Sequence, residues 1–506
     1  MQPAKYWALH RRTTTAASCC FLLLSAPVGK VSRRINKRFS VALGRISNSV
    51  GFRQGFSSFG KRLSQIQGCG VKRNPSVFAA KKEELGPMVH HLKDDLLPDW
   101  MRKERTRLLT QDVSDLKESG KCVVYWMQRD VRTVDNWALL LASHLAQANH
   151  VPLQVVYVLP PPPPEEEDAE DLPPKIMVTS PMTERYGAFM LGGLEKVHKE
   201  LQKEGVPLTV VLPSSSAGGV GSDLCEWIDQ CHPKIVVADC SPLRQFRGWI
   251  ENETAPLLRS REIPLVHVDA HNVVPVWQAS PKREVMARTI RGKISKQIRT
   301  FLTDFPPFHG NQHLKETKPQ LPAFAMEEYK AHLGWDESVP PVDWAQPGTA
   351  NAMKQYEAFV EKGLKRFDQL RNDPNYRNVC SKLSPWLNHG HVSFQRLALE
   401  TKRLNKYANG TAVYLEEGLI RRELSDNYVF YTPNDYDELT GAAAWAQETL
   451  QVHSADERDW NLSLEELEHG KTHDDLWNAA ELQLIQEGKL HGFVRFWFWA
   501  SRWLLP

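Results

Sequence analysis

Three groups of residues in the C-terminal third of the chain have types and spacings that could do chemistry. The first is Arg371-Asn-Asp-Pro, followed by Ser381-Lys-Leu-Ser-Pro-Trp; the second runs from Glu417 to Asn427; the third is a tryptophan-rich end. Each has an ordinary structural explanation, because Ser-x-x-Ser-Pro usually starts a helix, paired helical charges are usually solvated, and tryptophans usually pack in a core. Only their ordered combination points to a functional site.

Two kinds of element must position these residues. Short β-rich runs alternate with helical stretches between residues 122 and 269, and Asp135-Asn136 are good N-cap residues for the first such helix. This alternation predicts a parallel, doubly wound sheet. From about residue 350 to 505 the periodicity is helical almost throughout, which predicts a mainly α domain.

We therefore expect the chain to consist of five segments. They are a leader (1–85), a linker helix (86–120), an α/β domain (121–305) with an acidic, proline-rich surface insertion (160–174), a connector (306–345) and a helical domain (346–506).

Composition limits the class of protein. The chain has 506 residues, of which 42% are hydrophobic and 24% charged, as is typical of a soluble, globular protein. Its longest apolar stretch, Cys19 to Pro27, is far shorter than the roughly 20 residues that cross a bilayer. Eight cysteines without C-x-x-C spacing indicate neither a zinc site nor a disulfide framework, so we expect no metal.

The charge is unevenly distributed. Residues 1–82 hold 16 of the 63 Lys and Arg residues and no Asp or Glu, so the remaining 47 basic residues face all 60 acidic ones and leave about −13. The leader fits an organellar transit sequence, with a plastid as the expected destination and a mitochondrion or the nucleus as alternatives. A disordered basic tail, a signal peptide before the transit region and an upstream gene-model extension are the other interpretations.

Several segments, in order, resemble the class II cyclobutane pyrimidine dimer photolyases of the photolyase and cryptochrome superfamily. The most specific are Asp269-Ala-His-Asn-Val-Val-Pro-Val-Trp and Thr472-His-Asp-Asp-Leu-Trp-Asn-Ala-Ala. The others include Tyr125-Trp-Met-Gln-Arg-Asp, Ala287-Arg-Thr-Ile-Arg and Glu416-Glu-Gly-Leu-Ile-Arg-Arg-Glu-Leu. The resemblance runs from about residue 90 to 495.

This resemblance implies a Rossmann-like α/β antenna domain and a helical FAD-binding domain. It implies a carbon–carbon lyase, a deoxyribodipyrimidine photo-lyase, in which reduced FAD absorbs blue light, passes an electron to the dimer and recovers it after the ring opens. The partner would be damaged DNA whose dimer leaves the stack. A second antenna chromophore, a deazaflavin or a folate, is also implied, and no obligatory protein partner or membrane is expected.

Residue roles follow from the same resemblance. Ser381, Lys382, Leu383 and Ser384 match the turn that binds the FAD phosphates, although Lys382 stands where the family has a small or amide residue. From the family resemblance we expect a tyrosine at position 367 and a leucine at position 418, but this chain has Phe367 and Gly418. Arg422 and Asn427 would support the flavin pocket, and Arg495 matches the arginine that faces the flavin ring.

The catalytic and lesion-binding residues complete this assignment. Glu417 matches the glutamate that hydrogen-bonds the dimer, and we expect a buried, protonated donor there and a surface residue at Glu416. Arg371 and Asn372 match the lesion contacts. Trp477 matches the middle of the tryptophan relay, and Trp499, Trp497 and Trp503 are candidates for its flavin-proximal member.

Two alternatives to repair stay open. One is a cryptochrome-like light sensor, which usually carries a long C-terminal extension. The other is an inactive, C-terminally truncated flavoprotein, because the family's ending is absent after Arg495; for this reason we expect weak FAD binding. Retention of Glu417, Arg371 and Asn372 favours repair.

Overall fold

The computed structural model describes residues 89–162, 182–214, 219–313, 323–457 and 462–495. These fall into two compact units, one within Gly86–Arg371 and Tyr376–Ala442 and the other within Asn372–Asn375 and Ala443–Pro506. The expected leader and the expected insertion from residue 163 onward lie outside the described residues.

A six-stranded sheet forms the centre of the larger unit, in the order β1-β6-β5-β2-β3-β4. Its strands are β1 (Thr106–Leu108), β2 (Cys122–Trp126), β3 (Leu153–Val158), β4 (Leu208–Val211), β5 (Pro233–Asp239) and β6 (Leu265–Val268). Strands β2 to β6 pair in parallel, as expected, whereas β1 pairs antiparallel with β6 at the edge. The strand order reverses between β2 and β5, the place where sheets of this type bind ligands at their carboxyl ends.

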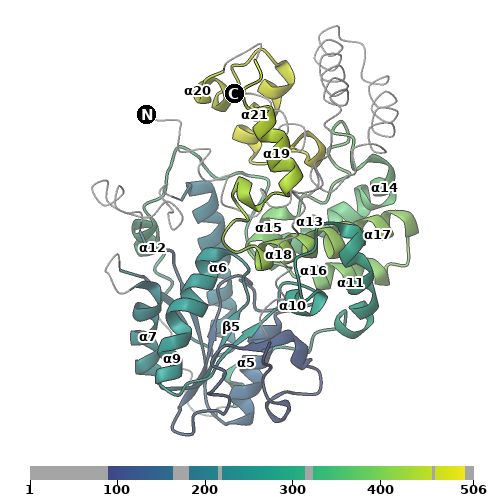
Figure 1. Cartoon of the computed structure of the whole chain (residues 1–506). Helices are drawn as coiled ribbons and strands as arrows, with labels where there is room; N and C mark the ends of the chain where they lie inside the picture. Colours follow the sequence, from purple (N-terminus) through teal and green to yellow (C-terminus); the bar gives the residue numbers. More distant parts are fainter. Residues whose placement is uncertain (1–88, 163–181, 215–218, 314–322, 458–461, 496–506) are drawn as a thin grey trace, which may run out of the picture. The chain divides into compact units, whose positions relative to one another are not determined.

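Helices cover both faces of this sheet (Figure 1). α5 (Trp137–Ala148) and α6 (Glu184–Lys203) pack on the face that presents Tyr125, and α7 (Gly219–Cys231), η4 (Gly248–Thr254) and α9 (Ala255–Ser260) pack on the face that presents Trp126. The Asn136 side chain caps α5, as expected, by accepting from the backbone N–H groups of Ala138 and Leu139. Strands buried on both faces account for the continuous apolar runs in the sequence.

The larger unit contains further helices (Figure 1). They are α8 (Arg244–Arg247), α10 (Val276–Ala279), α11 (Ala287–Phe301), η5 (Asn311–His313), α12 (Met326–Leu333), α13 (Thr349–Lys362), η6 (Leu364–Arg366), α14 (Phe367–Leu370), α15 (Ser384–Asn388), α16 (Phe394–Arg403), α17 (Ala408–Leu415), η7 (Glu416–Arg421), α18 (Arg422–Tyr431) and η8 (Leu439–Gly441). The smaller unit holds α19 (Ala444–Val452), α20 (Leu464–Glu468) and α21 (Asp475–Glu487).

Two expectations about organisation are wrong. The described part of the expected linker helix, 89–120, instead contains η2 (Asp94–Leu96), η3 (Lys103–Arg105) and strand β1, whose alternating burial fits a sheet edge. The compact units also do not divide near residue 346, because buried polar contacts tie the sheet to α18, as described below. No helix in the described part of the chain is long and apolar enough to span a membrane.

Candidate functional site

Glu417 and Arg371 face each other. Glu417 lies on η7, a π-helical turn between α17 and α18, and such turns are frequent at functional sites. The Arg371 Nε atom is 3.5 Å from Glu417 Oε1, with 27% and 44% of the two side chains exposed. The structure thus brings together two residues that the sequence assigned to lesion binding and catalysis.

The expectation that Glu417 is buried is wrong, because 44% of its side chain is exposed. The π-helical turn turns this carboxyl group outward, where water solvates it and a guanidinium faces it.

Glu416, which we expected at the surface, is partly exposed, and its carboxylate is paired. Its carboxylate accepts hydrogen bonds from Arg291 Nη2 at 2.6 Å and Nε at 3.1 Å, and Arg421 Nε lies 3.6 Å away. The hydrogen bonds from Arg291 lower the pKa of Glu416 despite its partial burial. This bidentate pair ties α11 to the π-helical turn that carries Glu417.

Position 418 must be glycine because the Phe394 ring leaves no space for a Cβ atom. A Cβ atom placed there would lie 1.7 Å from Cζ of Phe394, far inside contact distance. Phe394 is 3% exposed and begins α16. The phenyl ring therefore fills the space that the leucine expected at position 418 would occupy.

The turn formed by Ser381 to Ser384 has an unusual backbone. Lys382 has φ of 57°, in the left-handed region, whereas Leu383 has right-handed φ and ψ of −77° and −1°. Alternating conformations of this kind point successive N–H groups toward one side and form an anion-binding concavity. The Ser381 carbonyl accepts from Gln355 Nε2 at 2.9 Å, which fixes the turn against α13. Ser384 starts α15, a helix of only five residues.

Arg422, one of the expected cofactor residues, makes several contacts within the protein. Its Nε donates to the Gly418 carbonyl at 3.0 Å and its Nη2 to the His271 carbonyl at 3.1 Å. Its guanidinium lies 5.4 Å from the centre of the Phe394 ring. Its buried Nη1 has no hydrogen-bond partner among the described residues.

Asn427 has a different part in the structure. It is fully buried; its Oδ1 accepts from the Glu284 N–H at 2.7 Å and its Nδ2 donates to the Lys282 carbonyl at 3.1 Å. Its amide group thus links α18 to the loop before α11 by two hydrogen bonds.

A buried polar network anchors α18 to the carboxyl ends of the sheet strands. Arg129, which follows β2, makes a bidentate pair with Asp426 at 2.9 and 3.0 Å, and Asn272 Nδ2 donates to the same carboxylate at 2.8 Å. Burial raises the pKa of Asp426, but Arg129 overcomes it and holds the pKa at about 2. The network joins three of the segments that carry the family resemblance.

The smaller unit holds the remaining described candidates. Trp477 is 1% exposed on α21, and its Nε1 donates to the Leu467 carbonyl at 3.2 Å. The buried Nε of Arg495 has no partner among the described residues. Asn372 is exposed in the turn after α14. Trp497, Trp499 and Trp503 lie outside the described residues.

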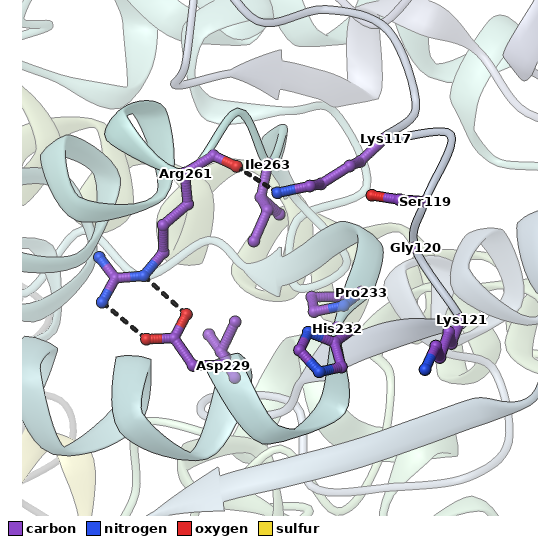
Figure 2. A pocket seen from close by; sticks show the side chains of 10 residues that line it. Lys117, Ser119, Gly120, Lys121, Asp229, His232, Pro233, Arg261 and Ile263 are labelled. Atoms are coloured by element: carbon purple, nitrogen blue, oxygen red, sulfur yellow. Dashed lines mark hydrogen bonds and ion pairs between the residues drawn. The ribbon is translucent and has the colours of Figure 1, made fainter.

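A cavity of about 310 Å³ opens at the opposite, amino edge of the sheet (Figure 2). Two of its cations already have partners, because Lys117 Nζ donates to the Arg261 carbonyl at 2.6 Å and Arg261 pairs with Asp229 at 2.7 and 2.8 Å. Ligands of parallel sheets bind at the carboxyl ends, so we do not assign the site to this cavity. In the described residues, no group of three or more His, Cys, Asp or Glu side chains is arranged to hold a metal ion.

Sequence reasoning missed Arg291, Phe394 and Arg129 as parts of this site. The Ala287-Arg-Thr-Ile-Arg segment and the glycine at position 418 were signals for the first two. The pairing partners themselves lie more than a hundred residues apart in the cases of Arg291 with Glu416 and Arg129 with Asp426. Periodicity, which reports on neighbours along one element, does not reveal them.

Comparisons with known proteins agree with these features. A family model described as DNA photolyase matches residues 123–310. The deoxyribodipyrimidine photo-lyase of Potorous tridactylus is 40% identical over 402 residues, covering 79% of this chain and 70% of that protein. The enzyme of the same name from Oryza sativa subsp. japonica is 37% identical over 401 residues, covering 76% and 72%.

Solved structures agree in fold. A bacterial class III photolyase from Agrobacterium tumefaciens matches with a TM-score of 0.51 at 21% identity, covering 75% of this chain and 72% of that one. A Synechocystis cryptochrome matches with a TM-score of 0.50 at 16% identity, covering 77% and 78%. These likenesses show the fold alone. Because the Potorous relative is 40% identical across most of both chains, this chain belongs to the DNA photolyase family.

Proposed function

We propose that this protein repairs cyclobutane pyrimidine dimers in DNA in a light-dependent reaction, as a class II deoxyribodipyrimidine photo-lyase. The observation that carries the proposal is the Arg371–Glu417 pair, a cation and a carboxyl group 3.5 Å apart on the surface of the larger unit. Membership of the family supplies the reaction class, and the pair supplies groups suited to a dimer and its strand.

Family membership implies a flavin, and the residues present fit FAD. The left-handed Lys382 followed by right-handed Leu383 forms a concavity suited to a diphosphate. The buried, unpartnered Nη1 of Arg422 offers a donor to an acceptor-rich ligand. When bound, FAD supplies the photoexcited electron that opens the cyclobutane ring.

The chain's own residues bind and orient the substrate. Arg371 holds the lesion-strand phosphate or base edge by charge-assisted hydrogen bonds, and Glu417 orients the dimer beside it. The clamp between Arg291 and Glu416 keeps the π-helical turn in place during this contact. Damaged bases, which stack poorly, enter such a site at the lowest cost in unstacking energy.

The test is repair of a dimer-containing oligonucleotide by the chain reconstituted with reduced FAD. We expect dimers to disappear under blue light and to persist in darkness, and an undamaged oligonucleotide to remain unchanged in both. Equal loss of dimers in light and darkness, or no loss in light, would contradict the proposal.

We also propose that the α/β part carries a second, light-harvesting chromophore, either a deazaflavin or a folate. The fold of the sheet and the family support this proposal. Acid extraction of the purified protein, followed by absorbance and mass measurement, would identify the compound. A preparation that releases a flavin as its only chromophore, even after incubation with both compounds, would count against it.

The acid-free composition of residues 1–82 supports a further proposal, import into a plastid. Residues 1–90 fused to a fluorescent protein should accumulate in plastids and lose the leader. A mitochondrial signal would favour the first alternative, and a diffuse cytosolic or nuclear signal would refute organelle import.

A further inference from the structure

Tyr414 contains a buried hydroxyl group without a partner. The side chain is 5% exposed on α17, and its Oη atom has no hydrogen-bond partner among the described residues. Burial raises the pKa of this phenol, so the group stays a neutral donor. Leaving such a group unpaired costs about 1–3 kcal/mol, and native structures contain few of them.

The ring of Tyr414 lies in an aromatic cluster beside the expected cofactor residues. Its centre is 4.9 Å from that of Phe359, 5.9 Å from that of Phe367 and 5.5 Å from that of Phe394. Phe367 stands where the family resemblance led us to expect a tyrosine hydroxyl. The cluster thus lacks the hydroxyl group expected at Phe367 and contains an unpaired hydroxyl group at the neighbouring Tyr414.

A second unpartnered donor belongs to Arg422, whose side chain also lies against Phe394. The guanidinium of Arg422 lies 5.4 Å from this ring, and its Nη1 is buried without a partner among the described residues. The side chains of Tyr414 and Arg422 both lie against the Phe394 ring, and each has an unpaired donor, which indicates a missing acceptor. FAD, with its diphosphate, ribityl and ring carbonyl oxygens, is rich in acceptors.

A neighbouring tyrosine shows the contrast. Tyr356 on α13 is 4% exposed, and its hydroxyl is 2.8 Å from Oγ1 of Thr401, which in turn donates to the Leu397 carbonyl. The hydroxyl of Tyr356 is therefore satisfied within the protein, whereas that of Tyr414 is not.

We propose that Tyr414 is a cofactor-binding residue whose hydroxyl donates to an oxygen of FAD, and that it replaces the hydroxyl absent at Phe367. Arg422 Nη1 donates to the same ligand. The inference rests on the proposed function, because it requires that the chain bind FAD.

The test compares two substitutions that each remove one oxygen atom. FAD affinity is measured by fluorescence quenching on the apoprotein, and stability by denaturant unfolding without FAD. Tyr414→Phe should weaken FAD binding about tenfold while leaving apoprotein stability unchanged or slightly higher. Tyr356→Phe should lower apoprotein stability and leave FAD affinity within about twofold, because it breaks only an internal hydrogen bond.

A rescue experiment tests the replacement of one hydroxyl by the other. Adding Phe367→Tyr to the Tyr414→Phe variant should recover most of the lost FAD affinity, and failure to recover it would refute the stand-in role. Undiminished FAD affinity in Tyr414→Phe, with normal binding by the parent chain, would overturn the inference alone. A parent chain that takes up no FAD would overturn the proposed function and this inference with it.

Discussion

At the scale of single residues, the proposed function depends on the Arg371–Glu417 pair on the surface of the larger unit. The two groups are close enough to attract each other, and both are exposed enough for a ligand to reach them. An exposed pair of this kind adds little to stability, since such pairs contribute about 0–1 kcal/mol. We therefore propose that the pair serves to bind and orient the substrate.

Glu417→Gln keeps the shape of the side chain and replaces its carboxyl group by an amide. We expect the repair yield per absorbed photon to fall roughly tenfold or more, because an amide pairs more weakly with Arg371 and with charge that develops on the dimer. Flavin absorbance per chain should stay unchanged. Glu361→Gln, an exposed position on α13, is the matched control and should repair normally. Full repair by the Glu417 variant would remove this residue from the mechanism.

Lys382 has a left-handed backbone conformation, which is consistent with the small or amide residue that the family has at this position. Its φ of 57° lies in the region where Gly and Asn are tolerated best, which explains why a small or amide residue is expected there. Lys382→Asn should raise the free energy of unfolding by a few tenths to about 1 kcal/mol in denaturant titrations. Lys365→Asn, at an exposed position on η6 with helical backbone, should bring no gain. A loss of stability in the first variant would show that the lysine side chain stabilises the turn.

At the scale of elements, the π-helical turn η7 and helix α16 fit together through Gly418 and Phe394. A methyl group at position 418 must displace a buried ring, so Gly418→Ala should cost about 1–3 kcal/mol of stability by overpacking. Gly292→Ala is the matched control, because a Cβ atom on α11 meets nothing within 4 Å and alanine favours helix. It should raise stability by up to about 1 kcal/mol. Equal effects of the two substitutions in thermal unfolding would contradict the packing at Gly418.

The elements also show how far sequence reasoning reaches. The β-rich runs and the cap at Asn136 were predicted correctly, because both depend on residues that are close in sequence. Strand β1 was missed because three residues give too short a pattern to distinguish from a turn. The exposure of Glu417 was mispredicted because the outward direction of a residue on a π-helical turn depends on an inserted residue that periodicity does not show. The family motifs identified Arg371 and Glu417, whereas their contact is a property of the fold.

At the scale of the whole larger unit, the sheet and the helices that carry the site are joined through buried charge. Arg129 and Asp426 pair at nearly full burial, and breaking such a pair costs about 3–5 kcal/mol because the remaining charge has no partner. Arg105 adds hydrogen bonds to the carbonyls of Asp269, Asn272 and Val273 in the same loop. The site residues on η7 and α18 are thus held by the carboxyl ends of the strands, which explains why the compact unit does not end at residue 346.

Glu423 makes the stability of this junction depend on pH. It is 2% exposed, and its carboxyl group accepts from the backbone N–H of Val273 at 2.7 Å and, more weakly, from that of Val274 at 3.4 Å. Burial raises its pKa to about 8, against the lowering effect of Arg422 and of these hydrogen bonds. Between its ordinary value of 4.5 and about 8, the folded chain holds a proton that the unfolded chain releases. This group therefore lowers stability as pH rises through that window, and its contribution becomes constant above about 8.

Glu423→Gln separates this effect from every other titration in the chain. Glutamine keeps an oxygen that accepts from Val273 and cannot ionise, so it resembles the protonated acid at every pH. In urea unfolding, we expect the variant and the parent to have similar stabilities near pH 5, and the variant to be more stable by at least about 1 kcal/mol near pH 8.5, since one pKa unit corresponds to about 1.4 kcal/mol. Glu361→Gln should leave the parent's pH dependence unchanged. A constant difference between variant and parent at both pH values would mean that Glu423 does not titrate in this window and that the junction holds it as a carboxylate.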